Sequence, residues 1–137
     1  MAGRSFFDSN VLVYTDDADA PAKRDRAVEL LAEHRRVRAG VISTQVLQEY
    51  FVASTRKLGV DTKLARRKVE LFGRFEVVGI GVDDITDAID LVRLHQVSFW
   101  DALIIRAARA AGCSRLYSED LHPGWRIEGL TVVNPFA

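Results

Sequence analysis

The apolar residues of this chain alternate between short continuous runs and longer stretches with helical spacing. The runs predict strands at residues 4–7, 37–42, 75–80, 115–117 and 130–133. Between them, apolar positions recur every three or four residues, which predicts helices that begin near residues 9, 21, 44, 62, 83 and 99. Strands that alternate with helices favour an α/β fold, in which helices cover both faces of a parallel sheet.

Capping residues and glycines mark the ends of several predicted helices. Pro21 suits the first turn of a helix that runs to about residue 36. Ser43 is a predicted N-cap, and Ser98 with Asp101 three residues later resembles a capping box. Gly112 ends the last helix. We find no internal repeat or linker, so we expect residues 1–137 to form a single domain.

Composition narrows the class of protein. The chain has 137 residues, of which 48% are hydrophobic and 28% charged, as in soluble globular proteins. It has no apolar stretch of membrane-spanning length and no signal pattern, so we expect a cytoplasmic protein without a membrane partner. One cysteine, Cys113, and three histidines do not make an internal disulfide or a zinc-type site. A net charge of zero argues against a protein that coats nucleic acid by charge alone.

Four acidic residues occupy related places in this pattern. Asp8 follows the first predicted strand and Asp120 lies just past the fourth. Glu49 lies in the helix that begins near residue 44, and Asp101 lies at the start of the last helix. Ligands bind beyond the carboxyl ends of parallel strands, and right-handed crossovers bring such positions to one edge. We therefore expect the four acids to converge.

Converging carboxylates repel one another, and proteins usually neutralise such a cluster with a hard cation. Mg²⁺ or Mn²⁺ accepts oxygen ligands and can activate water against a phosphodiester, so phosphodiester hydrolysis suits the arrangement. Each acid also has a purely structural interpretation. Asp8 and Asp101 can be helix caps, Glu49 a solvated helix residue, and Asp120 a turn former.

Four segments of the chain resemble the acidic motifs of PIN domain nucleases. They are residues 7–12 (FDSNVL), 48–49 (QE), 98–104 (SFWDALI) and 116–121 (LYSEDL), and the ending VVNPF at 132–136 is also typical. Among PIN domains, the chain is most similar to the VapC toxins of toxin-antitoxin pairs. The resemblance implies a PIN-like three-layer α/β/α sandwich with a five-stranded parallel sheet. It also implies a Mg²⁺- or Mn²⁺-dependent endoribonuclease, a homodimer, and a small antitoxin partner that holds it inactive.

The same resemblance assigns roles to individual residues. The implied catalytic acids are Asp8, Glu49, Asp101 and Asp120. Asp8, Asp101 and Asp120 would bind the metal, and Glu49 would act directly or through water. The supporting residues would be Asn10, Ser118 and Glu119, where Ser118 stands at a position that usually holds threonine. Because Glu119 directly precedes Asp120, the sequence leaves open which of the two faces the metal.

A basic cluster on the third and fourth predicted helices is our candidate for contact with the RNA backbone. It includes Arg56, Lys57, Arg66 and Arg67, for which a solvated helix face is an equally good explanation. Two other functions stay open. A PIN-like fold can bind without catalysis, and a receiver-like phosphoacceptor domain also places acids at strand ends. The receiver needs a lysine after its last strand, whereas this chain continues with Asn134-Pro135.

The same two helices carry many apolar residues. They are Tyr50, Phe51, Leu58, Leu64 and Phe72. In a VapC-like protein this pair of helices contributes to a groove for an apolar antitoxin segment. The alternative is that these side chains fill the core.

Overall fold

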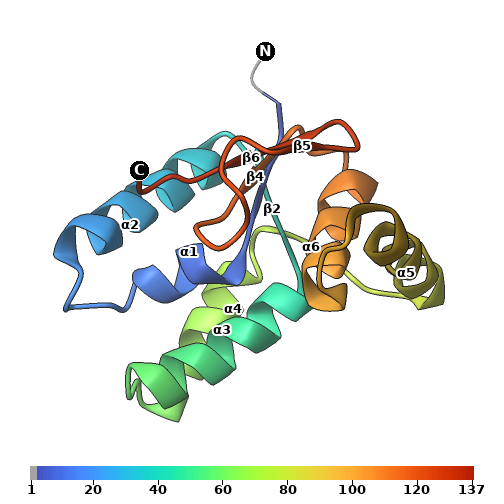
Figure 1. Ribbon diagram of the computed structural model, residues 1–137. Helices are drawn as coiled ribbons and strands as arrows, with labels where there is room; N and C mark the ends of the chain where they lie inside the picture. Colours follow the sequence, from blue (N-terminus) through green and yellow to red (C-terminus); the bar gives the residue numbers. More distant parts are fainter. Residues whose placement is uncertain (1–2) are drawn as a thin grey trace.

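A computed structural model describes residues 3–137 (Figure 1). Its sheet has the strand order β3-β2-β1-β4-β6-β5. The strands are β1 (Ser5–Phe7), β2 (Gly40–Ser43), β3 (Glu76–Val78), β4 (Arg115–Tyr117), β5 (Arg126–Ile127) and β6 (Leu130–Val133). β1, β2, β3, β4 and β6 pair in parallel, and β5 runs antiparallel to β6.

The sheet has six strands, so the expected five-stranded parallel sheet is wrong in its count. The five predicted strands are present, and β5 is the addition. It is two residues long, too short to produce a hydrophobic run, and it pairs with β6 across a tight turn at Glu128-Gly129. The second strand also begins later than its apolar run predicts, at Gly40. Val37 is the C-cap of the preceding helix, and Arg38 has a left-handed φ of 55°.

Helices cover both faces of the sheet, as predicted. They are α1 (Ser9–Tyr14), α2 (Pro21–Arg36), α3 (Thr44–Lys57), α4 (Thr62–Phe72), α5 (Val82–His95) and α6 (Phe99–Ala110). Figure 1 shows α2 on one side of the sheet and α6, backed by α5, on the other. The Ser43 cap is confirmed, because its hydroxyl accepts from the Val46 N–H at 3.3 Å. No helix within residues 3–137 has the length and apolar character needed to cross a membrane.

The central strand β1 is completely buried and held from both sides. Phe7 stacks on Tyr117 of β4 at 5.4 Å between ring centroids, and it meets the edge of His34 of α2 at 5.1 Å. His34 is buried with both ring nitrogens in hydrogen-bond contact, one with the Leu30 carbonyl and one with the Ser5 hydroxyl. This packing fixes the point where the chain leaves the sheet after β1.

A second set of contacts joins the turn after α1 to the α3–α4 pair. The Asp16 carboxylate accepts from the Tyr50 hydroxyl at 2.5 Å and from Lys68 Nζ at 2.8 Å. Tyr50 is fully buried and packs edge-on against Phe72 at 5.0 Å. Tyr50 and Phe72 therefore belong to the core, so the partner-groove interpretation is wrong for these two residues. Phe51, one position along α3, is 37% exposed.

Gly40 marks a place in β2 where no side chain fits. A Cβ there would lie 2.7 Å from two ring carbons of Phe75 and 3.2 Å from the ring of Phe7. We expect Gly40→Ala to lower the free energy of unfolding by roughly 1–3 kcal/mol, because overpacking usually has this cost. Urea denaturation measures the change. Gly79→Ala is the matched control, because nothing lies within 4 Å of its Cβ position. Equal stability of the two variants would contradict the close approach at Gly40.

Candidate active site

The predicted acidic site lies at the point where the chain changes direction across the sheet. From β1 the chain adds β2 and then β3 on one side, and it later adds β4 and β6 on the other. Phe7 of β1 and Tyr117 of β4 are paired, so Asp8 and Ser118 leave the sheet side by side. Such a switch point opens a crevice at the carboxyl ends of the strands. In Figure 1, α1, α3 and α6 begin at this end of the sheet.

Asp8 is buried at this end of the sheet, with 6% of its surface exposed. One carboxylate oxygen accepts from the Ser9 N–H at 2.7 Å, which makes Asp8 the N-cap of α1. The other accepts from the Ser118 hydroxyl at 2.7 Å. The capping interpretation is thus confirmed, and it leaves Oδ2 directed toward the turn that follows β4.

Desolvation by burial raises the pKa of Asp8 to about 6. The hydrogen bonds from Ser118 and Ser9 oppose this shift, and repulsion from the carboxylates of Glu49 and Asp120 adds to it. Glu49 and Asp120 therefore each lie within electrostatic range of Asp8. At neutral pH, Asp8 is a poorly solvated negative charge.

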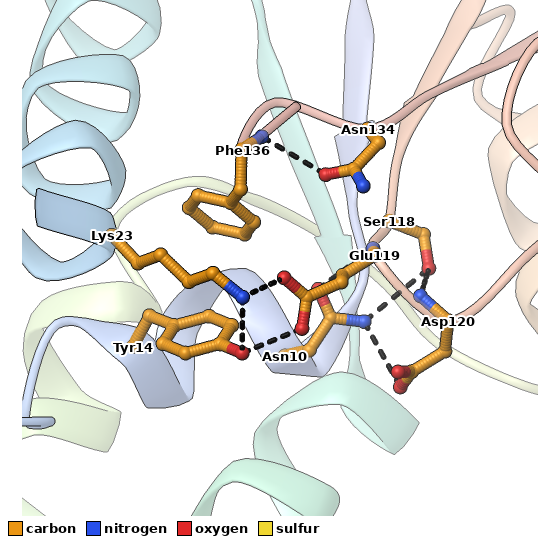
Figure 2. A network of polar contacts seen from close by, with 8 residues as sticks. All are labelled: Asn10, Tyr14, Lys23, Ser118, Glu119, Asp120, Asn134 and Phe136. Atoms are coloured by element: carbon orange, nitrogen blue, oxygen red, sulfur yellow. Dashed lines mark hydrogen bonds and ion pairs between the residues drawn. The ribbon is translucent and has the colours of Figure 1, made fainter. Parts of the chain in front are cut away.

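Asn10, in the first turn of α1, connects Asp8 with the turn that follows β4. Its Nδ2 lies 3.4 Å from Asp8 Oδ2, 3.3 Å from Ser118 Oγ and 3.2 Å from Asp120 Oδ2. Its Oδ1 accepts from the Glu119 N–H at 3.2 Å. Figure 2 shows Asn10 beside the turn of residues 118–120. These contacts suit the supporting role expected for Asn10 and Ser118.

Glu119 and Asp120 point in different directions from this turn (Figure 2). The Glu119 carboxylate accepts from the Tyr14 hydroxyl at 2.5 Å and from Lys23 Nζ at 2.6 Å. Partial burial alone would raise the pKa of Glu119, but these two donors hold the pKa below its usual range. Asp120 is exposed and lies against Asn10. Of the two adjacent acids, Asp120 is the one beside Asp8.

Glu49 is linked to the start of α6 through Gln45. The buried Gln45 donates through Nε2 to Glu49 Oε2 at 3.2 Å and to the Trp100 carbonyl at 3.1 Å. Gln45 Oε1 is buried without a hydrogen-bond partner in the described part of the chain. Sequence reasoning missed Gln45, although its position four residues before Glu49 puts both on one face of α3.

Asp101 lies in the first turn of α6, directly after Trp100. Its backbone N–H donates to the Ser98 hydroxyl at 3.0 Å, which confirms the N-cap. The reciprocal bond of a complete capping box, from the Ser98 N–H to the Asp101 carboxylate, does not occur in the described structure, so the box is only half formed. The metal-binding role of Asp101 stays a prediction.

The chemistry of these acids fits a hard divalent cation. In the described chain, none of the four pairs with a lysine, arginine or histidine, whereas the neighbouring Glu119 does. Carboxylate oxygens are the ligands that Mg²⁺ and Mn²⁺ prefer. No three such side chains within residues 3–137 are already grouped closely enough to hold an ion. Mg²⁺ commonly binds through one or two carboxylates and keeps several waters.

The structure separates the four predicted RNA-binding residues into two pairs. Arg56 and Lys57 line a groove of about 490 Å³ on α3 together with Glu49. Arg66 and Arg67 instead pair with Glu70 on α4. Only the α3 pair thus shares a surface with one of the acids.

Several solved toxin structures have the same fold as this chain. VapC20 of Mycobacterium tuberculosis, described as a sarcin-ricin loop cleaving toxin, is 23% identical with a TM-score of 0.70, covering 85% of this chain and 89% of that one. A toxin-antitoxin complex from Klebsiella pneumoniae is 21% identical with a TM-score of 0.68, covering 96% and 97%. VapBC2 of Rickettsia felis, bound to a promoter DNA fragment, is 19% identical with a TM-score of 0.68, covering 93% and 96%.

At these identities the likeness establishes the fold alone. No curated protein matches the sequence significantly. The family assignment comes from the PIN domain model, which matches residues 5–122. The matched range contains β1 through β4 and all four predicted acids. The chain therefore belongs to the PIN domain family.

Proposed function

We propose that this protein is a metal-dependent endoribonuclease and the toxin of a toxin-antitoxin pair. The observation that carries the proposal is the buried Asp8, which has two further carboxylates in electrostatic range and no basic partner in the described chain. A divalent cation would offset this charge. PIN family membership and the fold shared with VapC toxins support RNA as the substrate. Membership of the PIN domain family excludes the alternative of a receiver-like phosphoacceptor domain.

Each residue has a distinct part in the proposed reaction. Asp8, Asp101 and Asp120 would hold Mg²⁺ or Mn²⁺, with Glu49 binding directly or through water. The bound ion would lower the pKa of the attacking water and stabilise the charge that develops on the scissile phosphate.

The neighbouring side chains would keep these acids in place and bind the substrate. Asn10 and Ser118 hold Asp8 and Asp120 toward one another through their hydrogen bonds. Arg56 and Lys57 would bind RNA phosphates in the groove that contains Glu49.

An apolar groove between α3 and α4 suits an antitoxin segment. It has a volume of about 610 Å³, and its apolar lining is Leu47, Phe51, Val52 and Val69. Phe51 and Val52 are 37% and 48% exposed, so their apolar surfaces are accessible to the apolar face of a partner helix. Two of the solved relatives are toxin-antitoxin assemblies, which supports such a partner.

This groove adjoins the predicted RNA site, since Gln48 lines both the apolar groove and the one beside Glu49. An occupant of the first would therefore obstruct the second. The homodimer and the cytoplasmic location remain predictions. A PIN fold that binds RNA without cleaving it is the competing function, and the next experiment decides between them.

Asp8→Asn and Asp101→Asn each keep the size of the side chain and remove a charged ligand. We expect each to reduce Mn²⁺-dependent cleavage of RNA by roughly 100-fold or more, because the site loses electrostatic stabilisation. Glu49→Gln should lose less if Glu49 acts through water. Asp90→Asn, which changes an exposed acid on α5, is the control. Undiminished cleavage by the Asp8 or Asp101 variant would refute the assignment.

Asp8→Asn should also stabilise the protein in the presence of a chelator. The raised pKa of about 6 means that ionised Asp8 opposes folding at neutral pH. From the ordinary value near 3.9, this opposition is on the order of 3 kcal/mol. It fades as the pH falls through about 6 and is lost below about 4, where Asp8 is protonated in both the folded and the unfolded chain. Urea denaturation in chelator should therefore show an advantage for the variant that shrinks on acidification.

Millimolar Mn²⁺ should reverse this order by binding the native wild type more tightly than the variant. Thermal unfolding with and without the ion measures the effect. A variant that melts below wild type in chelator would show that the hydrogen bonds of Asp8 outweigh the burial of its charge.

Phe51→Asp tests the apolar groove. Expression of the wild type alone should slow growth, Asp8→Asn should remove the toxicity, and a small protein encoded next to the gene should restore growth by direct binding. Phe51→Asp should remain toxic but resist this rescue, because a charge in the groove weakens docking of an apolar segment. Leu94→Asp, at a 73% exposed position on α5, is the control. Equal rescue of both variants would exclude this groove as the antitoxin site.

A further inference from the structure

We propose that Lys23 and Tyr14 act with Glu119 as a clamp that positions Asp120. The clamp holds Glu119 away from the other acids, so the turn at residues 118–120 presents one metal ligand rather than two. Lys23, Tyr14 and Glu119 are positioning residues in this view. The inference rests on the proposed metal site, and it identifies parts of that site that the acidic motifs do not include.

The clamp engages both oxygens of the Glu119 carboxylate. Tyr14 donates to Oε1 at 2.5 Å, Lys23 donates to Oε2 at 2.6 Å, and Lys23 Nζ lies 3.3 Å from the Tyr14 hydroxyl. The ammonium also lies 5.0 Å from the centroid of the Tyr14 ring and 5.9 Å from that of Phe136. Figure 2 shows the closed arrangement. Because only 24% of the Glu119 side chain is exposed, this ion pair is better shielded than one on an open surface.

Helix α1 carries the effect of the clamp to Asp120. Tyr14 and Asn10 are four residues apart and therefore lie on one face of α1. Tyr14 holds the Glu119 side chain, while Asn10 holds the Glu119 N–H and the Asp120 carboxylate. The turn is thus fixed at its backbone and at two consecutive side chains. A rotation that released Glu119 would move Asp120, and loss of a residue that orients a metal ligand commonly weakens metal binding.

Two other roles for these residues would both change the Mn²⁺ affinity of Lys23→Met in the direction opposite to the clamp. If Lys23 acted by charge alone, Lys23→Met would remove a repelling positive charge and strengthen Mn²⁺ binding. If Glu119 were itself a ligand, Lys23→Met would release it toward the ion and again strengthen binding. The clamp requires weaker binding, because Lys23→Met and Glu119→Gln each loosen the turn that carries Asp120.

The test measures Mn²⁺ affinity by calorimetry without RNA. We expect Lys23→Met and Glu119→Gln each to weaken binding by roughly 10-fold, as loss of a residue that orients a ligand commonly does. The double variant should be no weaker than the weaker single variant, because both changes break the same contact. In cleavage assays, the Mn²⁺ concentration for half-maximal rate should rise by the same factor. A saturating ion should restore the rate of these variants but not that of Asp120→Asn.

Glu29→Gln is the matched control, since it removes the same charge from an exposed ion pair with Arg26 on α2. Tyr14→Phe removes one hydroxyl and serves if Lys23→Met fails to fold. Unchanged or tighter Mn²⁺ binding by the clamp variants would overturn the clamp. The proposed nuclease function would still hold in that case, provided that the wild type binds Mn²⁺ and cleaves RNA. Absence of Mn²⁺ binding by the wild type would overturn both.

Discussion

The burial of one negative charge at the end of β1 is the constraint on which the site depends. β1 is buried along its whole length, so the residue that follows it leaves the sheet in the interior rather than at the surface. An aspartate there loses most of its contact with water, and its hydrogen bonds with Ser9 and Ser118 only partly replace that contact. The surrounding structure concentrates negative charge instead of neutralising it.

The turn after β4 shows how two neighbouring acids acquire different properties. Glu119 is satisfied by an ammonium and a phenol, and its charge is balanced locally. Asp120, the next residue, is exposed and contacts the uncharged amide of Asn10. Successive residues of a turn point to different sides, so one short segment both anchors itself and offers a free carboxylate. The difference comes from the partners on α1 and α2, since the two acids are chemically alike.

Much of the fold follows from local signals in the sequence. Pro21 and Ser43 mark helix starts, because proline lacks the N–H that would be unpaired there and the serine hydroxyl accepts a hydrogen bond from one, and the structure places helix boundaries at both. The two-residue β5 and the late start of β2 could not be read in this way. They depend on pairing with β6 and on the left-handed turn at Arg38.

The sequence pattern places the candidate acids at strand ends and near the starts of helices, but it does not show their surroundings. Lys23 is far in sequence from Glu119, so no local pattern reveals their contact. The spacing of Gln45 and Glu49 on α3 is a local signal, but the contact of Gln45 with Trp100 is not. Tyr50 and Phe72 look like candidates for an exposed groove until the packing of α3 on α4 shows them buried. The sequence also could not distinguish Arg56 from Arg66, because their different neighbours are set by the turn between the two helices.

One helix, α3, carries Glu49, the Arg56–Lys57 groove and one wall of the apolar groove, and Gln48 lies where the two grooves meet. Under the proposed function, its residues would contact the metal site, the RNA and the antitoxin. A substitution that freed the protein from an inhibitor docked on this helix would alter the surface next to the acids. Resistance to inhibition and retention of activity would then be difficult to evolve together, which favours long-lived pairing between this protein and whatever binds there.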